Sequence, residues 1–142
     1  MKETIRKNIV DLPYSLHDAK VNKMKIQEEN IVLHFGRGFY KPANNDCLPV
    51  KGAAAISIQG LDLDFCHAYI LDTAGGCGKI TGEKISLEEF VNRFADIDFE
   101  ILDETYGYNQ SNFSGYLYNA GDIKECIIEM YHLGDMRYIT ED

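Results

Sequence analysis

Hydrophobic and polar residues alternate with a period of two along most of the chain, a pattern typical of β-strands with one buried face. We expect turns at Gly60 and at Leu133-Gly134-Asp135, the latter between the last two strands. Short connections between many strands favour an antiparallel sheet over βαβ units. The predicted strands are residues 21–26, 30–35, 54–58, 64–71, 79–85, 98–106, 114–120, 124–132 and 136–140.

The first two strands are separated by Gln27-Glu28-Glu29-Asn30, a polar stretch that predicts a hairpin. In the second strand, residues 31, 33 and 35 are hydrophobic and share one face. Val21 is out of phase with the other hydrophobic residues of the first strand. We therefore expect a β-bulge near Asn22.

One amphipathic helix is predicted at about residues 86–95. Ser86 and Glu89 have the spacing of a capping box, in which each side chain satisfies a free backbone N–H. Hydrophobic residues then recur at helical spacing and should form one buried stripe. The members of this stripe are Leu87, Phe90, Val91, Phe94 and Ala95.

Two other segments depart from the strand pattern. Residues 1–12 could form a short helix, with Ile5, Ile9 and Leu12 on one side and Pro13 as its end. Residues 36–52 are rich in Gly, Pro and Asn, which predicts an irregular loop that is either functional or mobile. The expected fold is one α+β domain over residues 1–142, a mostly antiparallel curved sheet or partly open barrel.

Composition narrows the classes of function. The 142 residues carry a net charge of -9, so a nucleic acid is an unfavourable partner, whereas a basic protein is electrostatically compatible. No segment has the roughly 20 apolar residues of a membrane span. The first 15 residues lack the features of a signal peptide, which indicates a cytoplasmic protein.

The four cysteines have no CxxC spacing and fit reduced, structural thiols better than disulfides. They are Cys47, Cys66, Cys77 and Cys126. Cys77 lies between glycines in residues 74–81, a stretch that resembles a phosphate-binding loop but lacks its required first glycine and final Ser or Thr. We expect a glycine-rich turn there. Cys77 would be a candidate nucleophile only if a base lay beside it.

His17 and Asp18 form the pair that most resembles a catalytic or metal site. With His34 they would reach the three ligands that a catalytic zinc needs, but no two histidines have the spacing that places both on one face. In the alternative, Asp18 forms an Asx-turn and His17 bonds a carbonyl at the sheet edge. A ligand-contacting role is the third possibility. We favour the Asx-turn, and predict neither a metal nor a cofactor.

The most suggestive stretch for binding is residues 103–121, in which aromatic residues alternate with Gly, Asn, Ser and Gln. This composition is typical of adaptable protein-binding surfaces. Alternatively, the tyrosines form an aromatic ladder across a hairpin. The candidate binding residues are Tyr106, Tyr108, Tyr116, Tyr118, Asp103 and Glu104.

Carboxylates are frequent in residues 96–105, yet no pair suited to acid–base catalysis stands out. Asp98, Glu100 and Glu104 should share one strand face with Leu102, as on a solvated strand. Serine-hydrolase, zinc-protease and EF-hand motifs are also missing from the sequence. The chain is therefore more consistent with a non-enzymatic protein than with an enzyme.

Residues 16–35, LHDAKVNKMKIQEENIVLHF, and the closing residues 134–140, GDMRYIT, resemble a group of small β-rich bacterial proteins. Some members of this group are classed with the immunity proteins of polymorphic toxin systems. The resemblance implies a cytoplasmic, non-enzymatic protein that binds and neutralises a protein partner. It carries no catalytic role onto His17 or Asp18. The alternative is a small-molecule-binding or hydrolytic protein with a pocket at the helix-covered end of the sheet.

Overall fold

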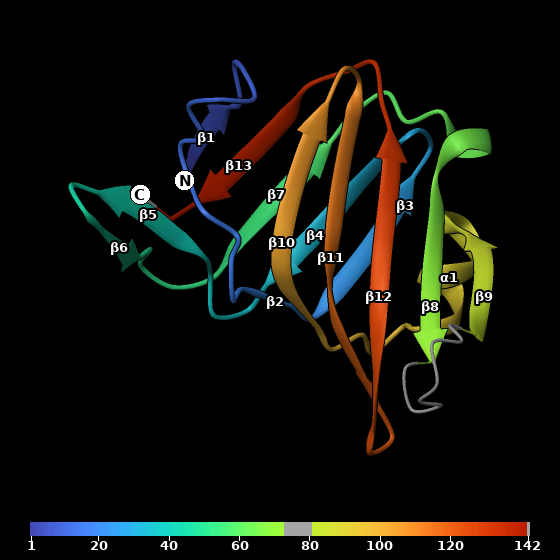
Figure 1. Ribbon diagram of the computed structural model, residues 1–142. Helices are drawn as coiled ribbons and strands as arrows, with labels where there is room; N and C mark the ends of the chain where they lie inside the picture. The colour runs from blue at the N-terminus through green and yellow to red at the C-terminus, as the bar shows by residue number, and fades with distance from the viewer. Residues whose placement is uncertain (73–80, 142) are drawn as a thin grey trace.

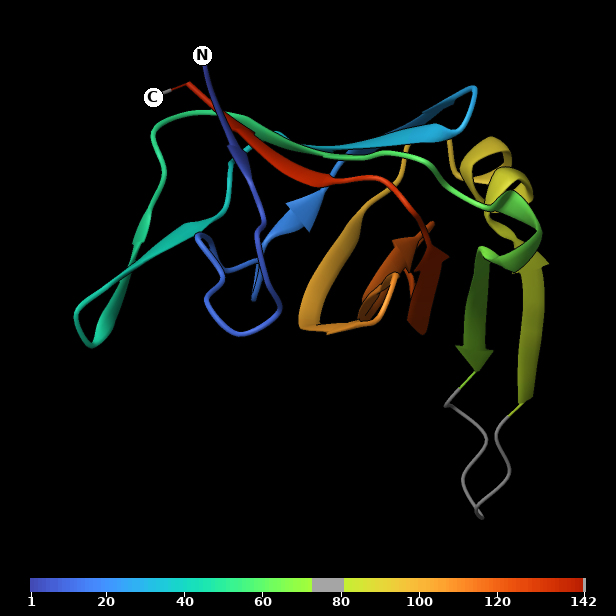
Figure 2. The ribbon, with the colours of Figure 1, turned by 90° about the horizontal axis from the view of Figure 1, so that it is seen from above.

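Two antiparallel sheets face each other across one hydrophobic core in the computed structural model, which describes residues 1–72 and 81–141 (Figure 1, Figure 2). The five-stranded sheet runs β1 (Lys2–Ile5), β13 (Met136–Thr140), β7 (Ala54–Ile58), β4 (Asn30–Phe35), β3 (Lys23–Gln27). The six-stranded sheet runs β2 (Lys20–Val21), β10 (Phe99–Gly107), β11 (Gln110–Asn119), β12 (Asp122–Tyr131), β8 (His67–Asp72), β9 (Thr81–Ser86). Both sheets are open, which confirms the predicted α+β class with curved antiparallel sheets.

Strict alternation along the strands determines which side chains enter the core. In β12, Cys126, Ile128 and Met130 are buried, while the residues between them point to the opposite side of the sheet. In β4 the predicted hydrophobic face is buried completely. Each sheet therefore has one inner face against the core and one outer face.

The hairpin predicted at Gln27 to Asn30 is confirmed, because β3 and β4 pair up to those two residues. Val21, however, belongs to the other sheet, since β2 pairs with β10. The chain changes sheets at Asn22, whose backbone N–H donates to the carbonyl of His34 at 2.9 Å. A change of sheet, rather than the expected bulge, therefore explains the phase of Val21.

The helix predicted for residues 1–12 is wrong. Residues 2–5 form β1, which pairs with the edge of β13. Ile5 and Ile9 are 41% and 51% exposed, so their helical spacing does not mark a buried stripe. The edge of β13 offers hydrogen-bond partners to the backbone of residues 2–6 in place of helical hydrogen bonds.

The irregular loop predicted for residues 36–52 is also wrong in part, because it contains a hairpin of β5 (Tyr40–Ala43) and β6 (Asp46–Pro49). Asn44 turns this hairpin with φ of 55°, a conformation that asparagine tolerates better than most residues. Outside its pairing with β6, β5 makes one further β-bridge, between Tyr40 and Ser15. Pro42 and Pro49 are tolerated because strands of a two-stranded sheet are edge strands, where a missing N–H need not cost a ladder bond.

Two predicted turns prove to be crossings between the sheets. Gly60 follows β7 and precedes a 3₁₀ helix, η1 (Leu63–Phe65), in place of the first residues of the predicted 64–71 strand. The turn at Leu133 to Asp135 carries the chain from β12 to β13, which lie in different sheets and do not pair. The two crossings are hydrogen-bonded to each other, with Leu133 N donating to Gly60 O at 2.9 Å.

The predicted helix is α1 (Leu87–Arg93), which packs against β3, β8 and β9 at one end of the sheets (Figure 2). Ser86 Oγ accepts from the N–H of Glu89 at 3.1 Å, which is the serine half of the predicted capping box, whereas the Glu89 carboxylate pairs with Arg93. Phe90 is completely buried, whereas Phe94 is half-buried and Ala95 is exposed. The helix thus ends slightly earlier than predicted, and its buried stripe is narrower.

Candidate protein-binding surface

A β-bulge in β10 divides the predicted binding residues between two faces. Ile101 pairs with Gly115 and Asp103 pairs with Ser114, so Leu102 is an extra residue. Beyond the bulge, the alternation is reversed and Glu104 points inward. The prediction that Glu104 shares a solvated face with Asp98 and Glu100 is therefore wrong.

The inward position of Glu104 is fixed by two hydrogen bonds. Its Oε2 accepts from the backbone N–H of Leu16 at 2.6 Å, and its Oε1 accepts from the Tyr106 hydroxyl at 2.6 Å. The guanidinium of Arg6 lies 4.2 Å from the centre of the Tyr106 ring. Burial, with the nearby Glu104, raises the pKa of Tyr106, so its hydroxyl stays protonated and serves as a donor.

The predicted aromatic ladder does not form. Tyr106 pairs with Ser111, whereas Tyr116 pairs with Glu100 near the opposite end of the hairpin. Tyr108 lies in the turn and is 92% exposed. The four tyrosines therefore occupy separate places: one inside, one at the turn and two on the outer side of the sheet.

Tyr116, Tyr118 and Asp103 share the outer side of the six-stranded sheet. Tyr116 is 36% exposed, and the Tyr118 hydroxyl donates to Glu100 Oε1 at 3.0 Å. This bond to Glu100 raises the pKa of Tyr118. Aromatic or aliphatic residues alternate here with carboxylates. We call the following set the outer face: Tyr69, Glu100, Asp103, Tyr116, Tyr118, Ile123, Glu125, Ile127, Glu129 and Tyr131.

The outer face is open to solvent over its central strands. Figure 1 looks onto it, with β10, β11, β12 and β8 in front of the strands of the other sheet. Ile123 and Ile127 are 60% and 37% exposed, although both are large hydrophobic residues. Within residues 1–72 and 81–141, no helix or strand covers this part of the sheet.

A hollow of about 270 Å³ lies in the centre of the outer face. Tyr116 and Ile127 form apolar walls, while Asp103 and Glu125 bring carboxylates to its rim. The hollow has the size and lining to receive one side chain of a protein partner.

His17 and Asp18 contact each other, with 3.5 Å between His17 Nε2 and Asp18 Oδ2. His17 Nδ1 lies 2.5 Å from the carbonyl oxygen of Leu102, the bulged residue, in agreement with the prediction that His17 bonds a carbonyl. That bond raises the pKa of His17. The Asx-turn predicted for Asp18 is replaced by a left-handed backbone with φ of 65° and a bond from its N–H to the carbonyl of Ile101. The residues that the structure describes contain no cluster of three or more His, Cys, Asp or Glu side chains able to hold a metal ion.

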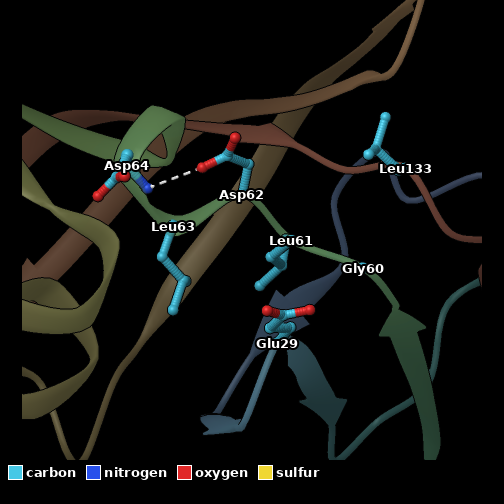
Figure 3. Close-up of a pocket in the computed structure, with 7 residues that line it drawn as sticks. All are labelled: Glu29, Gly60, Leu61, Asp62, Leu63, Asp64 and Leu133. Atoms are coloured by element: carbon cyan, nitrogen blue, oxygen red, sulfur yellow. Dashed lines mark hydrogen bonds between the residues drawn. The ribbon is translucent and has the colours of Figure 1, made fainter.

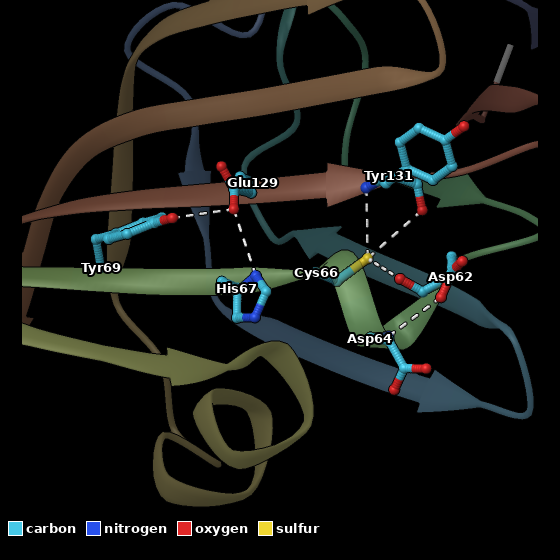
Figure 4. A network of polar contacts seen from close by, with 7 residues as sticks. All are labelled: Asp62, Asp64, Cys66, His67, Tyr69, Glu129 and Tyr131. Atoms are coloured by element: carbon cyan, nitrogen blue, oxygen red, sulfur yellow. Dashed lines mark hydrogen bonds and ion pairs between the residues drawn. The ribbon is translucent and has the colours of Figure 1, made fainter.

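A polar cluster on β8 and β12 was missed from the sequence (Figure 4). Glu129 pairs with His67 across the strands, and its Oε1 lies 3.3 Å from His67 Nδ1. The Tyr69 hydroxyl donates to the same oxygen at 3.0 Å. Residues 67 and 129 are far apart in the sequence, and only the pairing of β8 with β12 brings them together. One indication of this cluster was present in the sequence, since the alternation within each strand places both residues on the outward side of the sheet.

The described cysteines are free thiols, two of them buried. Cys66 Sγ donates to the carbonyl of Asp62 at 3.2 Å (Figure 4). Burial raises the pKa of Cys66, and that of Cys126 to about 12, so both remain protonated. Cys47 is exposed. Cys77 and most of the predicted glycine-rich turn at 74–81 lie outside the described residues.

A cavity of about 580 Å³ opens where the two crossings between the sheets meet (Figure 3). Glu29, Asp62 and Asp64 contribute carboxylates, while Leu133, which is 73% exposed, forms an apolar edge. Asp62 Oδ1 accepts from the backbone N–H of Asp64 at 3.3 Å and caps η1. This end of the molecule is therefore strongly acidic.

Ser111 and His132 form the arrangement closest to a catalytic pair. Ser111 Oγ lies 2.7 Å from His132 Nε2, and Arg6 donates to the same hydroxyl at 3.4 Å. Both residues are buried, at 0% and 3% exposure, between the two sheets. A nucleophile needs contact with its substrate, so this pair is a structural link within the core.

Two cavities flank α1, where the alternative hypothesis places a pocket, and their volumes are about 220 Å³ and 300 Å³. The first is below the range of roughly 300 Å³ and more that is typical of small-molecule sites, and the second lies at its lower end. Arg93, which lines the smaller cavity together with Lys124, is paired with Glu83 and Glu89. The described lining of both cavities contains no serine, cysteine or histidine that could serve as a nucleophile or base.

No protein-family model, no curated protein and no solved structure matches the chain. None of the helices in the described part of the chain has the length and hydrophobicity needed to cross a membrane.

Proposed function

We propose that this protein is a non-enzymatic, cytoplasmic binding module that holds a basic protein partner on its outer face, in the manner of an immunity protein that neutralises a toxin. The observation that carries the proposal is the uncovered outer face of the six-stranded sheet. Exposed tyrosine and isoleucine side chains lie there among carboxylates. Tyr116, Tyr118 and Asp103 belong to the proposed contact, with Tyr108 at its margin.

The side chains of the outer face favour a protein rather than a small molecule as the ligand. Tyrosine is enriched at protein interfaces because its rigid ring buries a large area at a low entropic cost. The hollow beside Tyr116 provides a pocket for an anchoring side chain. Carboxylates at its rim, together with the net charge of -9, steer a positively charged partner toward it.

Two of the predicted binding residues, Glu104 and Tyr106, lie on the inner side of the sheet, beneath the outer face. Glu104 and Tyr106 hold the loop at Leu16 against β10, and this loop carries His17 onto the bulge. The bulge in turn sets the direction of Asp103. We therefore assign Glu104 and Tyr106 a positioning role rather than direct contact with the partner.

The test is to capture the partner from a lysate of the source cells and to measure its affinity for variants of the outer face. Tyr116→Ala should weaken binding by about 2 kcal/mol or more. Leu48→Ala removes another exposed hydrophobic side chain, 55% exposed on β6, and should leave the affinity unchanged. Association should also slow as the salt concentration rises, because rim charges mainly affect the association rate.

An equal effect of Tyr116→Ala and Leu48→Ala would place the contact elsewhere on the molecule. A partner that binds equally fast at low and high salt would contradict the proposed steering by the carboxylates of the outer face. Both variants replace exposed side chains, so each should unfold at nearly the same denaturant concentration as the wild type. That measurement separates loss of contact from loss of fold.

A further inference from the structure

Besides the hollow at Tyr116, the outer face has a cavity of about 550 Å³ at its η1 end, between β8, β9 and β12. Phe65 and Tyr131 form its aromatic part, with ring centres 6.1 Å apart and an edge-to-face arrangement. Phe65 is 62% exposed, which is unusual for a phenylalanine. Its ring therefore offers a free face to a ligand.

Two carboxylates complete the lining. Glu129 uses Oε1 to accept from Tyr69 and to contact His67, while its Oε2 has no hydrogen-bond partner among the described residues (Figure 4). Asp62 lies between this cavity and the acidic cavity of Figure 3, and lines both. The site thus combines an exposed phenylalanine ring and a half-buried tyrosine ring with negative charge.

We propose that this cavity receives the guanidinium group of an arginine side chain from the protein partner. The inference rests on the proposed function, because it names the chemistry of the group that the partner inserts. Guanidinium is planar and weakly hydrated, so it stacks on aromatic rings and binds a carboxylate with two parallel hydrogen bonds. A lysine ammonium is more strongly hydrated and lacks the planar shape for both contacts.

Lys84 is the resident cation of this cavity. Its Nζ lies 5.5 Å from the centre of the Tyr69 ring, so it competes with an incoming cation for the same negative field. Removing Lys84 should therefore tighten the binding of a guanidinium group. This expectation distinguishes a specific cation site from simple contact with Phe65.

The experiment is a titration of the isotopically labelled full chain with N-acetyl-arginine amide, followed by the amide resonances in NMR spectra. N-acetyl-lysine amide serves as the second cation, and N-acetyl-citrulline amide as the neutral analogue of the same shape. The arginine compound should cause saturable shifts at Phe65, His67 and Tyr131. The lysine compound should bind more weakly, and the citrulline compound should cause no saturable shift.

Glu129→Gln should lower the affinity for N-acetyl-arginine amide by about tenfold or more, because it removes a charge-assisted hydrogen bond. Asp122→Asn makes the same change of charge on the same strand but outside the cavity, and should leave the affinity unchanged. Lys84→Ala should tighten binding by about threefold. Phe65→Ala, at an exposed position, gives an independent test should Glu129→Gln disturb the fold.

Equal shifts with arginine and citrulline compounds would overturn the inference, as would equal losses from Glu129→Gln and Asp122→Asn, which indicate diffuse attraction to an acidic surface. The titration needs no protein partner. Failure to bind arginine while Tyr116→Ala still weakens partner binding rejects only the cavity. A saturable arginine site without any effect of Tyr116→Ala rejects the central contact surface and retains the cavity.

Discussion

His132 is held between the two sheets with both ring nitrogens in contact with polar groups. Nδ1 lies 2.9 Å from the carbonyl oxygen of Gly134, and Nε2 lies 2.7 Å from Ser111 Oγ. A carbonyl can only accept, so Nδ1 carries the proton and Ser111 donates to Nε2. Burial, assisted by the positive charge of Arg6, lowers the pKa of His132.

We predict that His132 makes the protein less stable as the solution is acidified from neutral pH. Its pKa is lower in the folded state than the ordinary 6.5, so the unfolded chain binds a proton that the folded chain does not. The free energy of unfolding should fall by up to about 1.4 kcal/mol per pH unit below the unfolded pKa. Denaturant unfolding of wild type and His132→Gln between neutral and mildly acidic pH measures the difference.

Other titrating groups are shared by the two proteins in that comparison. The pKa of His17 is raised, so its stabilising contribution is present at low pH and lost as the pH rises through its folded value. This opposite contribution cancels when the two curves are subtracted. A difference that stays constant with pH would contradict the assignment of a neutral His132 in the folded protein.

At the scale of single elements, the bulge in β10 depends on Gly115. A Cβ atom at this position would lie 1.8 Å from the carbonyl oxygen of Glu100, which pairs one step away across the strands. The extra residue Leu102 draws the two backbones together here, and only glycine fits. Close approach of backbones is a common reason for glycine within a strand.

We expect Gly115→Ala to lower the free energy of unfolding by at least about 1–3 kcal/mol, since the backbone must move to accept the methyl group. Gly107→Ala in the same strand pair is the matched control, because the nearest atom to its Cβ would be 3.9 Å away. Denaturant unfolding should separate the two variants clearly. Equal stability would mean that the strands at the bulge can move apart at no cost.

Elements specified by local chemistry were predictable from the sequence. The cap at Ser86 and the hairpin at residues 27–30 depend on residues a few positions apart, and both are present. The bulge at Leu102 depends on which residue of β11 faces it, which the alternation within β10 does not reveal. Tyr106 and Glu104 were therefore assigned to the binding surface although they face inward.

At the scale of the whole molecule, the sequence did not indicate which strands share a sheet. The turns at Gly60 and Leu133 were correctly expected as breaks, yet each carries the chain into the opposite sheet. The cavity at Phe65 and Glu129 arises only because β8 pairs with β12, a contact between distant segments. Tyr116 and Tyr118, in contrast, reach the outer face by simple alternation within β11.

The shared core predicts that the two sheets unfold together. Ile56 in β7 and Ile128 in β12 belong to different sheets, are completely buried and lie in one hydrophobic cluster. Their strands are paired on both sides, so neither amide can exchange with solvent without breaking the core. Native-state hydrogen exchange should give both amides the same free energy of opening, equal to that of global unfolding.

The hairpin of β5 and β6 supplies the contrast within the same experiment. The residues of β6 are exposed, and the hairpin is a separate two-stranded sheet outside the two main ones. Its amides, such as that of Leu48, should therefore open at a lower free energy without unfolding the rest. Different opening free energies for Ile56 and Ile128 would show that each sheet is stable alone. In that case the crossings at Gly60 and Leu133, rather than the core, would hold the molecule together.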